Sequence, residues 1–368
     1  MLHAAAPLLA AIALSQTAPS APAAPAPSAP AAPAPQPGIP GLLASGATPQ
    51  RLVTGFVFLE GPAADAQGNM YFTDVRGEKI LRLTQDATGW KAAPIVESSG
   101  GCNGLMFTRE GRLFACQMGK GTLQEVKFAA DGSAALAPVV EQVGGAPVPG
   151  FNDLAITPDG GIYFTNMGRR SAPGAGGVYF TTTAGGEGRK LDCPVPVPNG
   201  TRTTTDGRTL LVVSSEKPEL WAFPIEGPGK LGTGRLAAAL VPPAGANPSG
   251  GDGFAVDAAG NIWMTLPGAR CIAVIDPAGK TLGHIPVPEA PSNCAFGGAD
   301  GRTLFITART SVYAVPTLAQ GWWLARGGAM PGAGAPAKAA PAAPASASPA
   351  PSGKTAGAPA TDAPAKKP

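Results

Sequence analysis

Histidine is almost missing from this chain of 368 residues, which contains only His3 and His284. A Ser-His-Asp triad, or a metal site built on histidines, therefore has almost no residues to draw on. The sequence also lacks a GxSxG elbow, a P-loop and a GxGxxG motif that opens a helix. His284 itself lies in GHIPVP between two predicted strands, where a surface position is expected. These absences argue against the common hydrolase and nucleotide-binding chemistries.

Charge and long apolar runs are also scarce. Charged residues make up 14% of the chain and the net charge is +3, so the composition does not indicate nucleic acid, and we expect none as a partner. No apolar run is long enough to span a membrane. The short apolar stretch at 4–14, followed by small residues, instead predicts a signal peptide over residues 1–18 and export to the periplasm or out of the cell.

Both ends of the chain lack the residues needed for a folded core. Residues 19–48 consist mainly of alanine, proline and serine, and residues 327–368 add a few lysines to the same composition. Such segments favour extended, solvated backbone, so we expect a disordered linker and a disordered tail. The folded domain is then residues 49–326, in which strands are predicted throughout and a short helix is expected only near residues 316–324.

The five cysteines include no CxxC pair and no Cys-His spacing, which argues against zinc. An odd number leaves at least one free thiol in an exported chain. Cys102 and Cys116 flank one predicted hairpin, and Cys271 and Cys294 lie on successive repeats, so either pair could form a disulfide. Burial as small apolar side chains is an equally good interpretation of all five.

What the sequence does have is a repeat of six copies, seen most clearly in GFNDLAITPDGGIYFTN at residues 150–166. Each copy places a carboxylate or amide residue eight positions before a turn glycine, with short apolar runs on either side. Successive turn glycines are 43, 49, 47, 53 and 41 residues apart. Short strands repeating every 40 to 50 residues are typical of a β-propeller with one blade per repeat. We therefore predict an all-β, six-bladed propeller, with residues 51–59 available as a closing strand.

One position of the repeat carries a carboxylate or an amide in all six copies. Equivalent positions in a propeller lie on a ring around the central channel, so these oxygen-bearing side chains are expected to converge at one mouth of it. Such oxygens suit a hard divalent cation such as Ca²⁺. The alternative is that Asn-Gly and Asp-Gly pairs are only turn residues, which fits the first and third copies poorly. The six ring residues are Glu60, Asn103, Asn152, Asn199, Asp252 and Asn293.

A cation at such a mouth can polarise a carbonyl or phosphoryl oxygen or activate water, and a carboxylate of the ring can accept the proton. Hydrolysis of a small lactone, ester or phosphoester is the chemistry that follows. The alternative is a non-catalytic exported propeller that binds a ligand or a partner, with the cation as a structural plug in the channel.

The blade motifs resemble those of the senescence marker protein 30, gluconolactonase and luciferin-regenerating-enzyme-like family, over roughly residues 50–317. EGPAADAQGNMYFTDVRGEKILRL resembles the first blade of that family, FNDLAITPDGGIYFTN the third, and DGFAVDAAGNIWMTLPG the fifth. The resemblance implies a six-bladed propeller with one divalent cation, Ca²⁺ first and Zn²⁺, Mg²⁺ or Mn²⁺ as alternatives. It also implies a gluconolactonase-like hydrolase acting on a small-molecule lactone or ester, with an aldonolactone as the default, and we expect a monomer.

Matched position by position, the family's cation ligands correspond to Glu60, Asp252 and one or both of Asn152 and Asn199. The same match makes Asp252 the general base. Asn103 and Asn152 correspond to substrate-binding positions. The ring is completed by the sixth residue, Asn293, for which the resemblance implies no chemistry.

The sequence departs from the family pattern around the expected substrate pocket. Gly150 stands where members often have an arginine, and Thr201 replaces an apolar residue. Arg169 and Arg170 follow the third blade, where they could face substrate or solvent. The cation site therefore looks intact while the substrate pocket looks altered.

Overall fold

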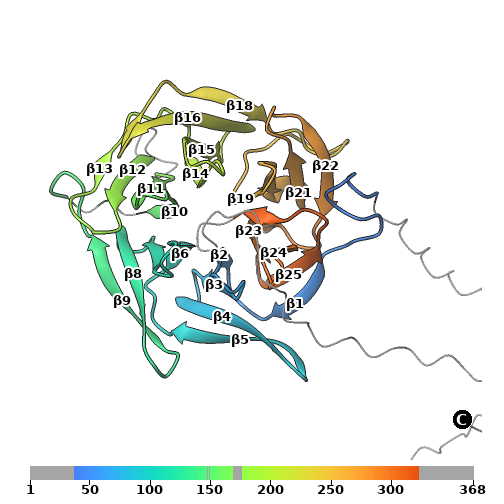
Figure 1. Ribbon diagram of the computed structural model, residues 1–368, viewed down its shortest axis with the longest axis horizontal. Helices are drawn as coiled ribbons and strands as arrows, with labels where there is room; N and C mark the ends of the chain where they lie inside the picture. The colour runs from blue at the N-terminus through green and yellow to red at the C-terminus, as the bar shows by residue number, and fades with distance from the viewer. Residues whose placement is uncertain (1–36, 147, 149, 169–175, 323–368) are drawn as a thin grey trace, which may run out of the picture. The chain divides into compact units, whose positions relative to one another are not determined.

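The computed structural model describes residues 37–146, 148, 150–168 and 176–322. These residues form six small antiparallel sheets arranged in a ring around a central channel (Figure 1), which confirms the predicted all-β, six-bladed propeller. Helical structure in the described ranges is limited to one 3₁₀ turn, η1 (Pro267–Ala269). Within the same ranges, no helix could cross a membrane. The predicted signal peptide, residues 19–36 of the linker and the predicted tail lie outside these ranges.

The first three blades each contain four strands, which run in chain order from the channel to the outer edge. Blade one consists of β2 (Leu59–Ala64), β3 (Met70–Asp74), β4 (Lys79–Asp86) and β5 (Gly89–Val96). Blade two consists of β6 (Cys102–Phe107), β7 (Leu113–Gln117), β8 (Thr122–Phe128) and β9 (Ala134–Val140). Blade three consists of β10 (Phe151–Ile156), β11 (Gly161–Asn166), β12 (Gly177–Thr182) and β13 (Arg189–Lys190).

Blades four and five each add a strand to this plan, and blade six takes its outer strand from the start of the chain. Blade four consists of β14 (Pro198–Thr203), β15 (Thr209–Ser214), β16 (Glu219–Gly227), β17 (Lys230–Leu231) and β18 (Arg235–Ala239). Blade five consists of β19 (Phe254–Asp257), β20 (Ile262–Leu266), β21 (Cys271–Ile275), β22 (Thr281–Pro286) and β26 (Gly321–Trp322). Blade six consists of β23 (Pro291–Gly297), β24 (Thr303–Ala308), β25 (Ser311–Pro316) and β1 (Gln50–Thr54).

The ring is closed by β1, which pairs antiparallel with β25 and forms the outer strand of blade six. The first strand of the folded chain thus completes the last blade. This confirms the predicted closing segment, although the strand ends at Thr54 and the chain then runs inward to the first strand of blade one (Figure 1).

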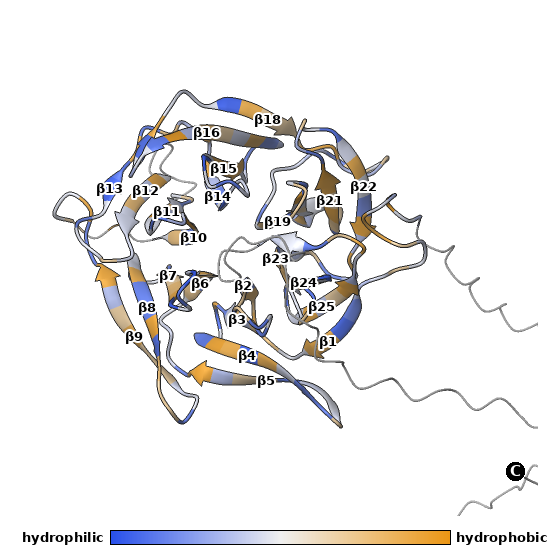
Figure 2. Cartoon of the chain, viewed as in Figure 1, coloured by the Kyte–Doolittle hydropathy of each residue, from blue (hydrophilic) through white to orange (hydrophobic). Residues whose placement is uncertain are grey.

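The apolar core is divided among the contacts between neighbouring blades. Six clusters of buried side chains fill these contacts, one for each pair of adjacent blades. Outer strands such as β18 and β22 carry hydrophilic and hydrophobic residues in turn (Figure 2), because one of their faces meets solvent. The sheets are therefore held together by face-to-face packing, which leaves their inner edges free to line the channel.

The prediction that residues 37–48 belong to a disordered linker is wrong. Ile39 and Leu43 are only 3% and 2% exposed and belong to the cluster between blades five and six. Their backbones pair with each other in a short bridge. The folded domain therefore begins before residue 49, because two apolar residues in a proline-rich segment are enough to anchor it.

The helix expected near residues 316–324 is also wrong within the described part of that segment. Gly321 and Trp322 instead form β26, which pairs with Asp257 and Val256 on the channel edge of blade five. A side chain on Gly321 would overlap with Phe296, so glycine is required for this close approach.

All five cysteines are free and buried, which confirms their reading as small apolar residues and rules out the two proposed disulfides. Cys102 lies opposite Gln117, so Cys116 points to the other face of its sheet. Cys271 and Cys294 belong to different interblade clusters. Burial raises the pKa of the Cys102 thiol to about 12, so it is protonated and unreactive at neutral pH.

Candidate functional site

The six ring residues lie at one end of the channel, which we name the ring mouth. Five of them are the second or third residue of an inner strand, and Asp252 stands two positions before β19. In those five blades the pairing of the inner strand shifts in register at or next to the ring residue. Such bulges bend a strand and re-aim its side chains. The repeat thus places a bulge and a polar residue together at the start of five of the six inner strands.

Glycine follows the ring residue in four blades because adjacent inner strands touch there. A side chain on Gly61 would overlap with the carbonyl of Asn103, and one on Gly200 would overlap with the carbonyl of Asp252. The same position is Asp153 in blade three. Close contact between the strands therefore brings successive ring residues together.

Hydroxyl groups fix the ring backbones from the neighbouring blade. The Thr73 Oγ1 donates to the carbonyl oxygen of Asn103 at 2.9 Å, and the Thr165 Oγ1 donates to that of Asn199 at 2.6 Å. Each threonine lies on the second strand of the preceding blade. The ring is consequently held by buried side chain–backbone bonds across blade boundaries.

Glu60 is 4% exposed and receives few hydrogen bonds. Its Oε2 accepts from the backbone N–H of Gly61 at 3.1 Å and from the Asn293 Nδ2 at 3.3 Å. Burial, and then the negative charge of Asp252, raise the pKa of Glu60 well above its usual range. Asn293, to which no role had been assigned, therefore contacts the carboxylate expected to bind a cation.

Asp252 is partly buried at the same mouth. Burial raises its pKa to about 7, and the Asp153 carboxylate adds to the shift, while a hydrogen bond from Asn199 partly offsets it. The Asn199 Nδ2 also donates to the Ser215 Oγ at 2.6 Å, and that hydroxyl donates to the Gly251 carbonyl at 3.1 Å. Ser215 thus holds the amide beside Asp252, a role the sequence did not reveal.

The two substrate-binding candidates are both buried. Asn152 is 4% exposed, and its Nδ2 lies 3.2 Å from the Met167 sulfur. Asn103 is 3% exposed and packs against Gly61 of the neighbouring blade. Both lie in the ring, whereas a side chain added at Gly150 would come within 2.9 Å of the Asn166 Oδ1. Arg169 and Arg170 lie outside the described residues.

Asp153 and Arg202 form an ion pair that the sequence reading missed. The Arg202 Nη1 lies 2.9 Å from the Asp153 Oδ2, and the two side chains are 12% and 2% exposed. The same nitrogen donates to the carbonyl oxygens of Thr201 and Leu154, at 2.6 and 3.1 Å. One feature of the sequence could have indicated this pair: Asp153 follows the ring residue of its copy, a position that is glycine in four other copies.

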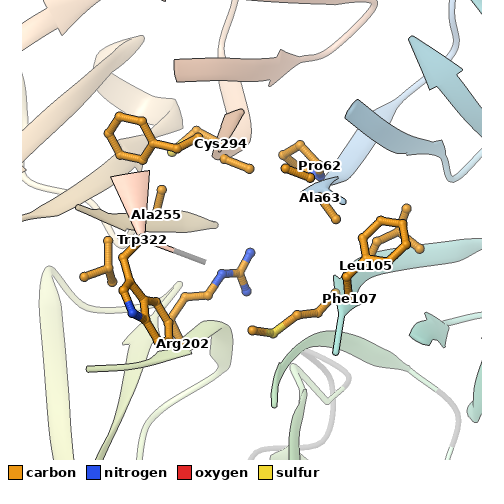
Figure 3. Close-up of a pocket in the computed structure, with 13 residues that line it drawn as sticks. Pro62, Ala63, Leu105, Phe107, Arg202, Ala255, Cys294 and Trp322 are labelled. Carbon is orange, nitrogen blue, oxygen red and sulfur yellow. The ribbon is translucent and has the colours of Figure 1, made fainter. Parts of the chain in front are cut away.

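Beyond the ring, the channel contains a cavity of about 50 Å³. The guanidinium of Arg202 projects into it, and apolar side chains such as Leu105 and Phe107 surround it (Figure 3). Trp322 of β26 lies on the side opposite Leu105 in this view. This part of the channel is therefore mostly apolar, in contrast to the ring.

The charges of the ring and the pair below it do not balance. Of three carboxylates here, Asp153 is paired with Arg202, whereas Glu60 and Asp252 are in no ion pair of the described residues, although the charge of Arg309 acts on Asp252. A divalent cation fits that deficit, and the amides of the ring supply further oxygen ligands. In the described ranges no group of three or more His, Cys, Asp or Glu side chains forms a metal site by itself. A cation here would consequently need the ring amides.

Comparison with known proteins agrees with this geometry. The SMP-30/gluconolactonase/LRE-like region matches residues 58–310, more than half of the chain. The chain therefore belongs to the SMP-30/gluconolactonase/LRE-like family.

Relatives in this family are distant. A Rhizobium meliloti protein assigned as a sugar lactone lactonase is 31% identical over 158 residues, 43% of this chain and 52% of its own. This chain thus matches about half the length of that relative. Lactonase drp35 of Staphylococcus aureus is 25% identical over 231 residues, 62% of this chain and 70% of its own. A solved gluconolactonase of Xanthomonas campestris is 27% identical with a TM-score of 0.62, covering 74% of this chain and 90% of its own.

Proposed function

We propose that this protein is a cation-dependent hydrolase of small lactones whose site is the ring mouth. The observation that carries the proposal is the pair of carboxylates Glu60 and Asp252 at the ring mouth, whose pKa values burial raises and which take part in no ion pair of the described residues. Membership of a family whose matched relatives are lactonases supports the choice of substrate.

Glu60 and Asp252, with the amide oxygens of Asn152 and Asn199, are the residues that would hold the cation. An all-oxygen set of this kind favours Ca²⁺ and also accepts Mg²⁺, Mn²⁺ or Zn²⁺. When bound, the cation supplies polarisation of the lactone carbonyl.

Asp252 is the proposed general base, because a carboxylate with a pKa of about 7 accepts a proton effectively near neutral pH. It takes a proton from water while the water oxygen attacks the carbonyl carbon. The ring C–O bond then breaks, and its oxygen leaves as a hydroxyl that takes up the proton, so the product is a hydroxy acid. Asn199 would orient Asp252, and Asn103 and Asn152 would bind substrate hydroxyls.

The test is pH-stat hydrolysis of a panel of aldono- and γ-lactones. The protein is first treated with a chelator and then supplied separately with Ca²⁺, Mg²⁺, Mn²⁺ or Zn²⁺. We expect turnover only after a cation is restored. Tight cation binding by calorimetry on the same sample, without turnover of any lactone, would instead identify a ligand-binding propeller with a structural cation.

We also propose that the protein is exported, on the strength of the apolar stretch at 4–14 alone. Mass spectrometry of the mature protein from the source cells tests this proposal. An intact Met1, or fractionation with the cytosol, would overturn it.

A further inference from the structure

The turns between the second and third strands of the blades lie at the ring mouth. The ring residues show this, because Glu60 pairs with Thr73 near the end of β3, and Asn293 pairs with Thr307 near the end of β24. The chain turns directly after these positions. The side chains of these turns therefore surround the entrance to the candidate site.

Each of the five such turns that the structure describes in full carries a cation. All five side chains are exposed to solvent. The same turns carry only two carboxylates, Glu78 and Glu216. We name the five cations the collar: Arg76, Lys120, Lys217, Arg270 and Arg309.

The collar cations form no ion pair among the described residues, although the charge of Arg309 acts on Asp252 and partly offsets the rise that burial causes in its pKa. Six ion pairs occur among the described residues, and none of them includes a collar residue. Lys79, by comparison, stands at the end of one of these turns and pairs with Glu97 at 2.8 Å. The positive charge of the collar is therefore left available at the entrance.

Two collar arginines lie over one aromatic ring, that of Phe58. The guanidinium carbon of Arg76 lies 5.4 Å from the centre of the Phe58 ring, and that of Arg309 lies 5.7 Å from it. Phe58 stands two residues before Glu60, and the carbonyl of Arg309 accepts from the N–H of Leu59 at 2.8 Å. One aromatic ring thus positions two like charges at the edge of the site.

Two collar arginines occupy a backbone conformation that glycine adopts more easily. Arg270 and Arg309 adopt left-handed φ angles of 52° and 48°. In the corresponding turn of blade two, the residue with a left-handed φ, of 70°, is a glycine, Gly121. Glycine adopts this conformation without the steric cost that a side chain incurs. All four non-glycine residues with positive φ in the described ranges lie on the ring-mouth side, which is where functional strain is expected.

We propose that the collar recognises an anionic group on the substrate, so that the preferred lactones carry a carboxylate or a phosphate in addition to the ring. This inference rests on the proposed lactonase function. The cation at the ring would hold the lactone carbonyl, and Arg76 and Arg309 would bind the anionic group at the edge through charged hydrogen bonds. The remaining collar cations raise the rate of encounter with an anion.

The experiment compares a neutral aldonolactone with the same lactone bearing a carboxylate or a phosphate at its terminal carbon. We expect kcat/KM to be about tenfold higher for at least one anionic lactone, with the advantage shrinking as ionic strength rises. In the double variant Arg76→Gln with Arg309→Asn, the ratio of anionic to neutral kcat/KM should fall about tenfold. Asparagine is chosen because it tolerates the left-handed backbone. Arg208→Gln, an exposed arginine at the other end of the channel, is the matched control.

Each outcome decides the inference. A preference for the carboxylate or for the phosphate names the anionic group. Turnover of the neutral lactone as fast as both anionic ones overturns the collar proposal while leaving the lactonase function intact. If no lactone is hydrolysed, the lactonase function fails, and calorimetric binding of the same compounds then tests the collar. Equal affinity for neutral and anionic lactones overturns the collar as well. So does an unchanged affinity for the anionic lactones in the double variant.

Discussion

At the end of the channel away from the ring, which we name the far mouth, aspartates bond to their own turns. The Asp257 Oδ1 accepts from the backbone N–H groups of Ala259 and Asn261, at 3.0 and 2.9 Å. Asp206 does the same with the N–H of Arg208, and the Thr204 hydroxyl and this bond lower its pKa. At the ring mouth burial raises the pKa values of the Glu60 and Asp252 carboxylates, and the charge of Asp252 adds to the shift at Glu60.

The difference shows that residue type alone does not mark a site in this repeat. Asp-Gly pairs occur at both ends of the blades. At the far mouth they are the turn residues of a hairpin, with nearby N–H donors that favour the charged form. At the ring mouth the bulged inner strands turn the side chains toward the channel, where few donors meet them. A cation is expected only at the end where the donors are missing.

The largest expected effect comes from removing one ring carboxylate. Asp252→Asn should lower kcat for lactone hydrolysis by roughly a thousandfold, because it removes both the proposed base and a cation ligand. Steady-state kinetics and calorimetric cation titration check this. Retained stoichiometric cation binding together with full activity would remove Asp252 from the site. Circular dichroism should show an unchanged fold.

The matched change at the far mouth should act on stability instead. Asp257 is 1% exposed and also accepts from the Asn261 Nδ2 at 2.8 Å and the Trp263 Nε1 at 3.1 Å. Asp257→Ala should therefore cost about 3 kcal/mol of unfolding free energy, because several buried donors lose their acceptor. Urea denaturation measures the loss. Turnover per folded molecule and cation affinity should not change, and a weakened cation site would break the contrast between the mouths.

Glycine substitutions sharpen the contrast through packing. A side chain on Gly200 would overlap with Asp252 and lie 2.9 Å from the Gly253 Cα, so Gly200→Ala should cost about 2 kcal/mol and weaken cation affinity. Gly111 at the far mouth has nothing within 4 Å but has φ 83°. Gly111→Ala should cost about 1 kcal/mol, from backbone strain alone, with no change in cation affinity. Thermal unfolding and calorimetry separate the two effects.

The smallest expected effect is on the pH dependence of stability, to which Asp252 at the ring mouth and Asp206 at the far mouth contribute with opposite signs. Between about pH 4 and about pH 7, the cation-free folded protein keeps a proton on Asp252 that the unfolded chain has released, so raising the pH destabilises the fold. Since Asp252 is partly exposed, we expect on the order of 1 kcal/mol. Asp206 acts in reverse, because its lowered pKa stabilises the fold above its ordinary range and the gain disappears on acidification.

Urea unfolding of chelated protein at pH 5 and pH 7 measures this dependence. Asp252→Asn should flatten it, and a saturating cation should reverse it, because ligation favours the charged carboxylates. An identical slope in the chelated wild type and in Asp252→Asn would contradict the raised pKa.

Much of the fold was predictable because the repeat is local. Each copy encodes its own hairpin through an Asp-Gly or equivalent turn, and six copies at regular spacing define six blades. The closing strand was predictable as well, because residues 51–59 form an apolar segment with no other blade to join. The ring followed from the same repeat, since equivalent positions in equivalent blades must lie around one axis.

What escaped prediction depends on pairing between distant segments. Nothing near Arg202 in the sequence indicates that it pairs with Asp153, and nothing near Gly321 indicates that it joins blade five. Ile39 and Leu43 were hidden by the prolines around them, although two apolar side chains were enough to pack. Nothing in the sequence indicates the role of Ser215, and only the structure shows its hydroxyl next to Asn199.

Closure of the ring by β1 has a consequence for the order of events during synthesis. Glu60 and Asn293 are 233 positions apart, yet they lie side by side in the finished ring. A ribosome that has just completed blade one has therefore made half of this contact and must translate almost the whole domain before the other half exists. The proposed ligands themselves end at Asp252, but Glu60 gains the bond from Asn293 only once blade six has been made, so the ring takes its final form in whichever compartment the last blade folds.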